Sequence, residues 1–365
     1  MTTGAPPSVE SVGGWTGVLE RLFRRQDLSA EAAAAALESV LAGEAGPAVV
    51  AAFLAGLRTK GETAEEMAGL VSAMRARAEP LVIPGELVDT CGTGGDRVGT
   101  INVSTIAALV VAGAGGKVCK HGNRALSSMT GSADVLEALG VVIDLGPEGV
   151  ARCVAEAGIG FCFAPRFHPA MRHVGPVRRE LGVATVFNFV GPLANPAGAK
   201  RQLIGVGDPA MAERMLAVLE ASGTIHSMVV FGHDGMDELS TLTTSTVLET
   251  VRRPDAPGYE RRAFEVDPVA LGLGRAEPAD LRGGEPALNA SLAAGVLAGE
   301  PGRRRDFVLL NGGAALVVAG LVETIEAGME LAASVLDSGQ AAAALERLVA
   351  ASRSAPAPEV GRSAP

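Results

Sequence analysis

The stretch Leu87–Ala114 reads LVDTCGTGGDRVGTINVSTIAALVVAGA and decides the fold class of this 365-residue chain. A short apolar run at Leu87–Asp89 comes first, three glycines within residues 92–95 follow, and Ser104–Ala114 then has the composition of an apolar helix. A strand, a glycine-rich loop and a helix in this order are typical of parallel sheets flanked by helices. Glycines let such a loop curl and present several N–H groups to an anion, although a tight turn without a ligand explains the loop alone equally well.

Strand-like and helical segments continue to alternate after this stretch. Residues 254–286 are an exception, because they are rich in proline, glycine and charge and predict a long irregular connection. We therefore expect an α/β fold with a mainly parallel central sheet, whose ligands bind beyond the carboxyl ends of the strands. The predicted strands are 87–89, 141–145, 160–163, 185–189, 202–206 and 226–231, and the predicted helices are 104–114, 133–139, 147–157 and 209–222.

The residues before this stretch predict helices only. Trp15, Val18 and Leu22 are spaced for one face of a helix, and Ser29 and Thr63 can each cap a further one. Prolines at positions 80 and 84 then interrupt the helical pattern. We expect an N-terminal tail at 1–14, a small all-helical domain at 15–85 with part of 166–200 packing on it, a larger α/β domain at 86–350 and a flexible tail at 351–365.

Charge and composition exclude several classes of protein. The formal net charge is −10, which argues against binding to nucleic acid or to an anionic membrane surface. No two of the four cysteines form a C-x-x-C pair, so a zinc site is not expected. The N-terminus lacks the pattern of a signal peptide, and the longest apolar stretch, Phe307–Val322, is too short to span a bilayer. These features predict a cytoplasmic protein without membrane contact.

Four further polar segments lie in predicted loops or at predicted helix starts. Lys120–Arg124 offers cations for phosphate, 127–137 brings hydroxyl groups to a helix N-terminus, and 165–179 combines cations, imidazoles and apolar surface. In Asp234–Glu238 the adjacent carboxylates repel each other unless they share a cation, and Mg²⁺ suits a few carboxylates together with diphosphate oxygens. Taken singly, each segment also fits a simpler description, namely a solvated basic or acidic turn, an ordinary helix cap or a packing histidine.

In this order, the segments resemble the anthranilate phosphoribosyltransferase family. The resemblance rests on Gly92–Asp96, Asn102–Thr105, Lys120–Arg124, Ser127-Ser128 with Gly131–Glu137, His168–Met171, Phe187-Asn188, Gly191–Pro196 and Asp234–Glu238, with weaker similarity from Leu57 to about residue 345. It implies a small helical domain beside a larger α/β domain, and a homodimer formed through the small domain. It also implies transfer of the phosphoribosyl group of 5-phosphoribosyl 1-diphosphate to anthranilate, a step of tryptophan synthesis, with Mg²⁺ at two ions per subunit.

The family pattern also implies roles for individual residues. It implies no general base, since positioning and charge stabilisation supply the catalysis. The implied metal ligands are Ser104, Asp237 and Glu238. The implied phosphoribosyl diphosphate ligands are Gly92, Gly94, Gly95, Asp96, Thr100, Asn102, Ser104, Thr105, Lys120 and Ser132, and the implied anthranilate-binding residues are Gly92, His121, Asn123, Pro165, His168, Met171 and Arg178.

The chain departs from the family pattern at a few positions only. Cys119, Met129, Thr130 and Ala184 stand where other residues are usual, and Met129 and Thr130 leave the detail of their loop open. Two other functions remain as alternatives. A pyrimidine nucleoside phosphorylase-like enzyme would lack the Asp-Glu pair, and a nucleic-acid-binding relative of the family would be expected to be basic.

Overall fold

Four helices form the N-terminal part of the computed structural model, which describes residues 8–94, 99–125 and 129–355. They are α1 (Gly14–Phe23), α2 (Ala30–Leu41), α3 (Pro47–Lys60) and α4 (Ala64–Ala76). Ser29 caps α2, and Thr63 with Glu66 forms a capping box on α4, as expected for a hydroxyl followed three residues later by a glutamate. A 3-10 helix at Val9–Val12 precedes them and buries Val9, so the tail expected at 1–14 is partly ordered against the helices.

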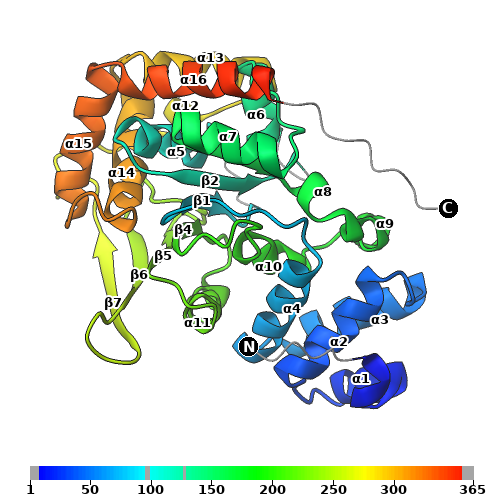
Figure 1. Ribbon diagram of the computed structural model, residues 1–365. Coiled ribbons are helices and arrows are strands. Elements are labelled where there is room, and N and C mark those ends of the chain that lie inside the picture. Colours follow the sequence, from blue (N-terminus) through cyan, green and yellow to red (C-terminus); the bar gives the residue numbers. More distant parts are fainter. Residues whose placement is uncertain (1–7, 95–98, 126–128, 356–365) are drawn as a thin grey trace.

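A seven-stranded sheet forms the centre of the larger domain, in the order β3-β2-β1-β4-β5-β6-β7. The first five strands in this order are parallel, and β6 and β7 extend the sheet as an antiparallel pair. The fold class predicted from the sequence is therefore confirmed (Figure 1). The strands are β1 (Val88–Gly92), β2 (Val118–Gly122), β3 (Ile159–Phe163), β4 (Arg201–Gly205), β5 (His226–Gly232), β6 (Ser245–Arg252) and β7 (Tyr259–Val266).

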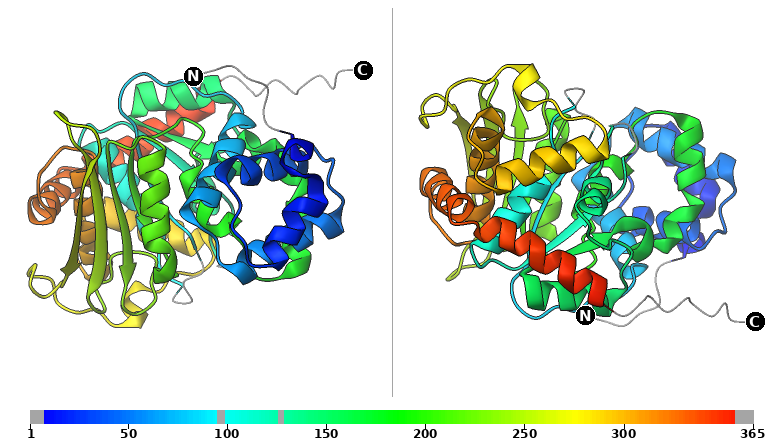
Figure 2. Two further views of the ribbon diagram at one scale, coloured as in Figure 1. Left: turned by 90° about the horizontal axis from the view of Figure 1, so that it is seen from below. Right: turned by 90° about the horizontal axis from the view of Figure 1, so that it is seen from above.

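Helices cover both faces of the sheet because side chains alternate between the faces along each strand. Leu203 and Met228 face a core shared with α5, α7 and α14 to α16, whereas Ile204 and Val229 face α10 and α11. Figure 2 shows α11 lying along one face of the sheet. The helices that follow α4 in the chain are α5 (Val103–Gly113), α6 (Ser132–Ala138), α7 (Pro147–Ala157), α8 (Ala164–Phe167), α9 (Gly175–Leu181), α10 (Phe187–Leu193), α11 (Ala212–Ala221), α12 (Pro278–Leu281), α13 (Pro286–Leu297), α14 (Arg303–Val318), α15 (Ile325–Asp337) and α16 (Gln340–Ser354).

The second of these cores is continuous with the interior of the helical domain. Buried side chains of α2 and α4 belong to the same cluster as Phe187 and Val190 of α10 and Met215 and Leu219 of α11. α4 packs directly against both α10 and α11. The small domain is therefore attached to one face of the sheet through two helices, and not through a linker alone.

Several elements of the structure differ from those predicted from the sequence. Residues 141–145 bury Val141, Ile143 and Leu145 in the alternating way of a strand, yet they pair with no strand among the described residues. The strand expected at 185–189 is wrong, because Phe187–Leu193 is helical and buries residues 187, 190 and 193 at helical spacing. α16 continues to Ser354 with Ala351 and Ser352 buried, so an ordered helical turn replaces the start of the expected C-terminal tail.

Three strands were not predicted from the sequence. β2 follows directly on an apolar helical run and carries Lys120 and His121. These polar residues interrupt the apolar pattern by which a buried strand is recognised. β6 and β7 are the antiparallel extension, and β7 lies inside the segment expected to be irregular, with most of its side chains exposed or half-exposed. Among the helices of the described residues, none combines the length and the apolar character that a membrane span requires.

Candidate active site

The predicted site residues lie on loops that leave the same edge of the sheet. β1, β2, β4 and β5 are parallel neighbours in the sheet, and each ends in a glycine, at Gly92, Gly122, Gly205 and Gly232. The carboxyl ends of parallel strands meet at one edge, where ligands of open α/β sheets bind. The glycine loop, the Lys120–Arg124 segment and the acidic turn of Asp234–Glu238 therefore face one region (Figure 1).

The glycine loop after β1 is held by Asp237, which follows β5. The N–H of Gly94 donates to Oδ2 of Asp237 at 2.8 Å, and Asp237 is only 6% exposed. A Cβ at position 92 would lie 2.3 Å from the same oxygen, and a Cβ at position 205 would lie 1.6 Å from the Asp237 carbonyl oxygen. Side chains at positions 92 and 205 are therefore sterically excluded. Gly94 has open space around it, but its φ of 69° favours glycine.

The acidic turn contains two adjacent carboxylates, Asp237 and Glu238. Burial raises the pKa of Asp237, because a carboxylate without water around it loses solvation, and a bound cation would restore favourable electrostatics. Within the described part of the chain, no group of three or more His, Cys, Asp or Glu side chains could hold a metal by itself. Mg²⁺ commonly binds one or two carboxylates and takes its other ligands from phosphate and water. Asp237 and Glu238 fit that pattern.

Lys120 extends from β2 into a buried polar network. Its ammonium group donates to the Thr90 carbonyl and, at 3.4 Å, to the Ser104 hydroxyl, and the residue is 2% exposed. Ser104 is at the N-terminus of α5, where the helix dipole favours phosphate. A cation, a hydroxyl and a helix N-terminus thus come together beside the glycine loop.

Asp89 lies beneath this network and was not singled out from the sequence. It is fully buried, accepts from the His121 N–H at 3.1 Å and from Nδ2 of Asn195 at 2.8 Å, and Asn195 also donates to the Cys119 carbonyl. Burial raises the pKa of Asp89 to about 6, and the charge of Lys120 opposes that rise. The sequence does contain a signal for Asp89, namely an acidic residue inside a short apolar strand. A buried carboxylate of this kind needs hydrogen-bond or charge partners.

His121 and His168 form a buried imidazole pair. Their ring centroids are 5.1 Å apart, and the Nε2 atom of each has no hydrogen-bond partner within the described structure. Burial lowers the pKa of His168 to about 4 and that of His121 well below its ordinary value, so both rings are neutral at pH 7. Neutral rings can offer apolar surface and a single N–H, but no charge.

Arg178 is a cation on α9. Its Nη2 donates to Oδ1 of Asn188 at 3.2 Å, its guanidinium lies 5.6 Å from the centre of the Phe187 ring, and the side chain is half-buried. Arg179 on the same helix is exposed. α9 begins at Gly175, and a separate 3-10 helix occupies Pro169–His173.

The remaining predicted residues lie on several segments. The backbone carbonyl of Asn123 accepts from the Ser132 hydroxyl at 3.4 Å, and Thr105 is buried with a hydroxyl that has no partner within the described structure. Pro165 is exposed on α8 and Met171 is half-exposed on the following 3-10 helix, in the same segment as His168. Thr100 and Asn102 contact residues 282–289, a contribution that the sequence did not indicate. Gly95 and Asp96 lie outside the described residues.

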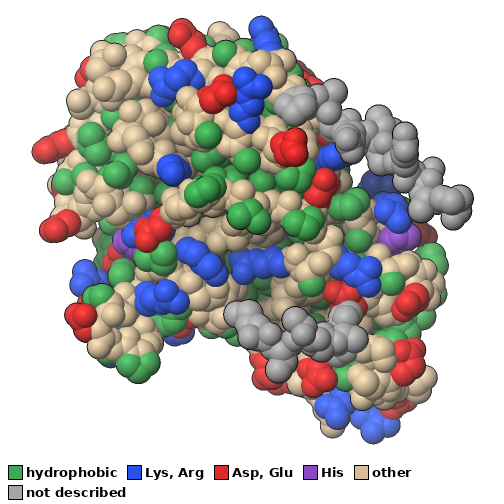
Figure 3. Space-filling view, viewed as in Figure 1, with side chains coloured by type: hydrophobic (Ala, Val, Ile, Leu, Met, Phe, Trp, Pro, Cys, Tyr) green, Lys and Arg blue, Asp and Glu red, His purple; other side chains and the backbone are tan. Residues whose placement is uncertain are grey.

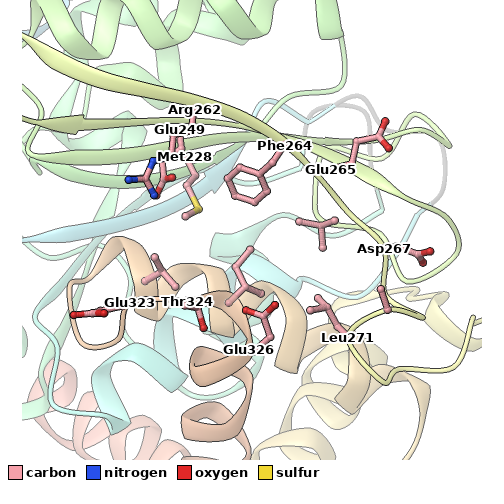
Figure 4. Close-up of a pocket in the computed structure, with 14 residues that line it drawn as sticks. Met228, Glu249, Arg262, Phe264, Glu265, Asp267, Leu271, Glu323, Thr324 and Glu326 are labelled. Atoms are coloured by element: carbon pink, nitrogen blue, oxygen red, sulfur yellow. The ribbon is translucent and has the colours of Figure 1, made fainter.

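A second pocket, of about 390 Å³, lies between β7 and the start of α15 (Figure 4). Carboxylates of Glu249, Glu265, Asp267, Glu323 and Glu326 line it together with Arg262 and several apolar side chains. None of the predicted site residues lines this pocket. Its acidic lining is unsuited to a diphosphate, so we place no substrate there.

Positive charge is concentrated locally on this acidic chain. In the face shown in Figure 3, lysine and arginine side chains form a band across the middle of the molecule. A net charge of −10 therefore does not prevent the surface from presenting cations to an anionic small molecule.

Comparisons with known proteins agree with this description. Residues 16–78 match the model described as "Glycosyl transferase family, helical bundle domain", and residues 84–342 match "Glycosyl transferase family, a/b domain". The chain is 51% identical over 333 residues to the anthranilate phosphoribosyltransferase of Roseiflexus castenholzii, with 91% of this chain and 96% of that protein covered.

Two solved structures are also similar. The crystal structure of anthranilate phosphoribosyltransferase from Thermus thermophilus has a TM-score of 0.85 and 44% identity, covering 92% of this chain and 99% of that one. The Saccharomyces cerevisiae enzyme in complex with PRPP and Mg has a TM-score of 0.82 and 26% identity, covering 93% and 98%.

Proposed function

The chain belongs to the anthranilate phosphoribosyltransferase family, and from this we propose that it joins the amine of anthranilate to C1 of 5-phosphoribosyl 1-diphosphate, releasing diphosphate. The product, N-(5-phosphoribosyl)anthranilate, is an intermediate of tryptophan synthesis. The observation that carries the proposal is the contact between Asp237 and the glycine loop, with Lys120 beside it. This arrangement brings an ammonium group, a hydroxyl and a carboxylate to one sheet edge, groups that suit a magnesium diphosphate.

The reaction breaks the bond between ribose C1 and the diphosphate oxygen and forms a bond from C1 to the anthranilate nitrogen. Positive charge develops on the ribose while negative charge collects on the departing diphosphate. We propose that Lys120 and the N-terminus of α5 stabilise that negative charge. Bound Mg²⁺ would neutralise further diphosphate charge. The amine gives up one proton to water, and we assign no general base, because holding the two substrates in line supplies much of the acceleration.

We propose that Asp237 and Glu238, with Ser104, serve two Mg²⁺ ions per subunit. Asp237→Asn should raise the Mg²⁺ concentration needed for half-maximal activity by about ten- to a hundredfold, since a neutral amide is a poor magnesium ligand. The Gly94 contact should survive, because an amide oxygen can still accept that N–H. Magnesium titrations of the initial rate measure the effect.

The stability of the metal-free Asp237→Asn protein provides the control. Burial raises the pKa of Asp237, so its ionised form destabilises the fold at neutral pH. The variant should therefore unfold at the same temperature as the parent protein or higher when Mg²⁺ is absent. Unchanged magnesium dependence in the variant would remove Asp237 from the metal site.

We propose that Arg178 binds the anthranilate carboxylate. Arg178→Ala should weaken apparent anthranilate affinity by about ten- to a hundredfold, because a charge-assisted hydrogen bond is worth about 1.5–3 kcal/mol and about 1.4 kcal/mol is a factor of ten. The KM for phosphoribosyl diphosphate should barely change, since its proposed ligands lie on other loops. Steady-state kinetics with each substrate varied in turn measure both effects.

Arg179→Ala is the matched control, because Arg179 is exposed on the same helix. It should leave both KM values unchanged. If Arg179→Ala weakens anthranilate affinity and Arg178→Ala does not, Arg179 holds the carboxylate. If neither variant changes anthranilate affinity, Asn123 becomes the better candidate.

We propose the other phosphoribosyl diphosphate ligands from the family pattern, and likewise His121, Asn123, Pro165, His168 and Met171 around anthranilate. We also propose domain limits of 15–85 and 86–350, a homodimer formed through the small domain and a cytoplasmic location. Light scattering coupled to gel filtration tests the dimer, and a monomeric mass for the active protein would exclude it.

The assay for the proposed function is the loss of anthranilate fluorescence on mixing with phosphoribosyl diphosphate and Mg²⁺. We expect the loss to need all three components and to stop when Mg²⁺ is chelated. Mass spectrometry of the product should show one phosphoribosyl group added to anthranilate. If the fluorescence does not fall and both substrates are recovered unchanged, the proposed function is wrong.

A further inference from the structure

Four hydrogen bonds form a closed ring around the N-terminus of α5. Nδ2 of Asn102 donates to the Thr130 carbonyl at 3.0 Å, and the Thr130 hydroxyl donates to the Gly284 carbonyl at 2.6 Å. The Gly284 N–H donates to Oδ1 of Asn289 at 2.7 Å, and Nδ2 of Asn289 donates to Oδ1 of Asn102 at 2.9 Å. The ring joins three segments that are distant in sequence.

The ring determines how the Asn102 side chain is oriented. A carboxamide has distinct donor and acceptor ends. The donor from Asn289 requires Oδ1 of Asn102 on its side, and the Thr130 carbonyl requires Nδ2 on the other. Asn102 precedes α5 without capping it through its side chain, so the ring accounts for its orientation. One N–H and one lone pair of the Asn102 amide remain for a ligand.

Asn289 is well placed to hold this arrangement rigid. It lies on α13, is 2% exposed and has both ends of its amide engaged. A Cβ at position 283 would lie 2.6 Å from its Oδ1, so Gly283 lets the chain approach closely. The Gly283 N–H in turn donates to the Gly99 carbonyl, and Thr100 pairs with Arg282. Residues 99–102, which follow the glycine loop, are therefore held against residues 282–289.

We propose that Asn289 is a positioning residue for phosphoribosyl diphosphate, acting through Asn102 and the turn at Thr130. The proposal rests on the proposed function, because it concerns the affinity of that substrate's site. Asn289 itself needs no contact with the substrate. Its loss frees the Asn102 amide to rotate and removes the link between Asn102 and α13, so the effect falls on one substrate and not on the other.

The experiment compares two positions on the ring. Asn289→Ala removes the bonds to Asn102 and Gly284, and Thr130→Val removes the hydroxyl on the opposite side with little change in shape. Each should raise the KM for phosphoribosyl diphosphate by about tenfold, the lower end of the effect seen when supporting partners of a ligand are lost. The KM for anthranilate should change less than about twofold. Thr130→Ser, which keeps a hydroxyl, should restore the parent value.

The double variant tests whether the ring acts as one unit. Asn289→Ala combined with Thr130→Val should raise the KM by less than the product of the two single effects, because each change breaks the same ring. Thr250→Val is the matched control, since it removes a buried hydroxyl bond to Glu220 on the distant strand β6. That variant should leave both KM values unchanged.

The outcomes separate this inference from the proposed function. If the unsubstituted protein does not convert anthranilate, the proposed function fails. If the unsubstituted protein does convert anthranilate, the two variants test the inference alone. The inference fails if Asn289→Ala and Thr130→Val leave the KM for phosphoribosyl diphosphate unchanged, or if they raise the KM values for both substrates equally. Should Asn289→Ala not fold, the pair Thr130→Val and Thr130→Ser decides by the same criterion.

Discussion

Gly92→Ala is expected to lower kcat/KM for phosphoribosyl diphosphate by two to three orders of magnitude, roughly the cost of losing a preorganised donor in an active site. The added Cβ would lie 2.3 Å from Oδ2 and 3.1 Å from Cγ of Asp237, and neither atom belongs to a long flexible side chain. Asp237 has to move, and the Gly94 N–H loses its acceptor. One methyl group thus disturbs both the glycine loop and the acidic turn.

Calorimetric binding of phosphoribosyl diphosphate and steady-state kinetics measure this loss, and a native far-UV spectrum shows that the fold persists. Gly46→Ala is the control, because position 46 has φ −68° and open space where a Cβ would be. It should behave as the parent protein. Parental kcat/KM in Gly92→Ala would mean that the glycine loop and Asp237 do not approach each other in solution.

Lys120→Met has the second largest expected effect. The ammonium group is buried beside Ser104 and is the charge that opposes the raised pKa of Asp89. We expect kcat/KM for phosphoribosyl diphosphate to fall by about a hundredfold, because a charge-assisted contact of about 1.5–3 kcal/mol is lost at a phosphate. Methionine has a similar length and preserves most of the packing. Kinetics with the diphosphate substrate varied measure the fall.

The stability of Lys120→Met should depend on pH in a definite direction. Asp89 has a pKa of about 6 in the folded protein, above the ordinary value of 3.8, so the native state binds the extra proton between these values. That contribution to stability is present at acid pH and is lost as the pH rises through the folded pKa. Without Lys120 the folded pKa is higher, so the loss extends to higher pH.

Thermal unfolding measures this effect. The melting temperature of Lys120→Met should lie further below that of the parent protein at pH 8 than at pH 5. In an Asp89→Asn background, where position 89 no longer titrates, Lys120→Met should lower the melting temperature equally at both pH values, each compared with Asp89→Asn alone. A deficit of Lys120→Met against the parent protein that is equal at both pH values would show that Lys120 and Asp89 are not coupled.

The predictable parts of the fold are those that local sequence specifies. The run from β1 through the glycine loop to α5 was predicted because strand, loop and helix each have a local signature. The segment 141–145 has the alternation of a strand but pairs with none among the described residues, and pairing depends on partners that a local pattern does not contain. For α10, the aromatic and β-branched residues Phe187, Phe189 and Val190 suggested a strand, whereas packing against α4 and α11 favours a helix.

The same distinction applies to the candidate site. The glycine loop, Lys120 and the acidic turn were recognisable as motifs, and the structure brings their loops to one edge of the sheet. Asp89 and Asn289 were not identified, because each acts through residues distant in sequence that only the folded chain brings within reach. Motif analysis finds side chains that meet a ligand more readily than those that hold other side chains in place.

The cluster of buried side chains that runs from α2 and α4 into α10 and α11 limits how this enzyme can be recombined with its relatives. A chimera that took only residues 8–80 from a distant relative would match foreign side chains against Val190, Met215 and Leu219. Close-packed interiors tolerate such mismatches poorly. The transplantable unit is therefore discontinuous in sequence, and α10 and α11 would have to be exchanged together with the four N-terminal helices.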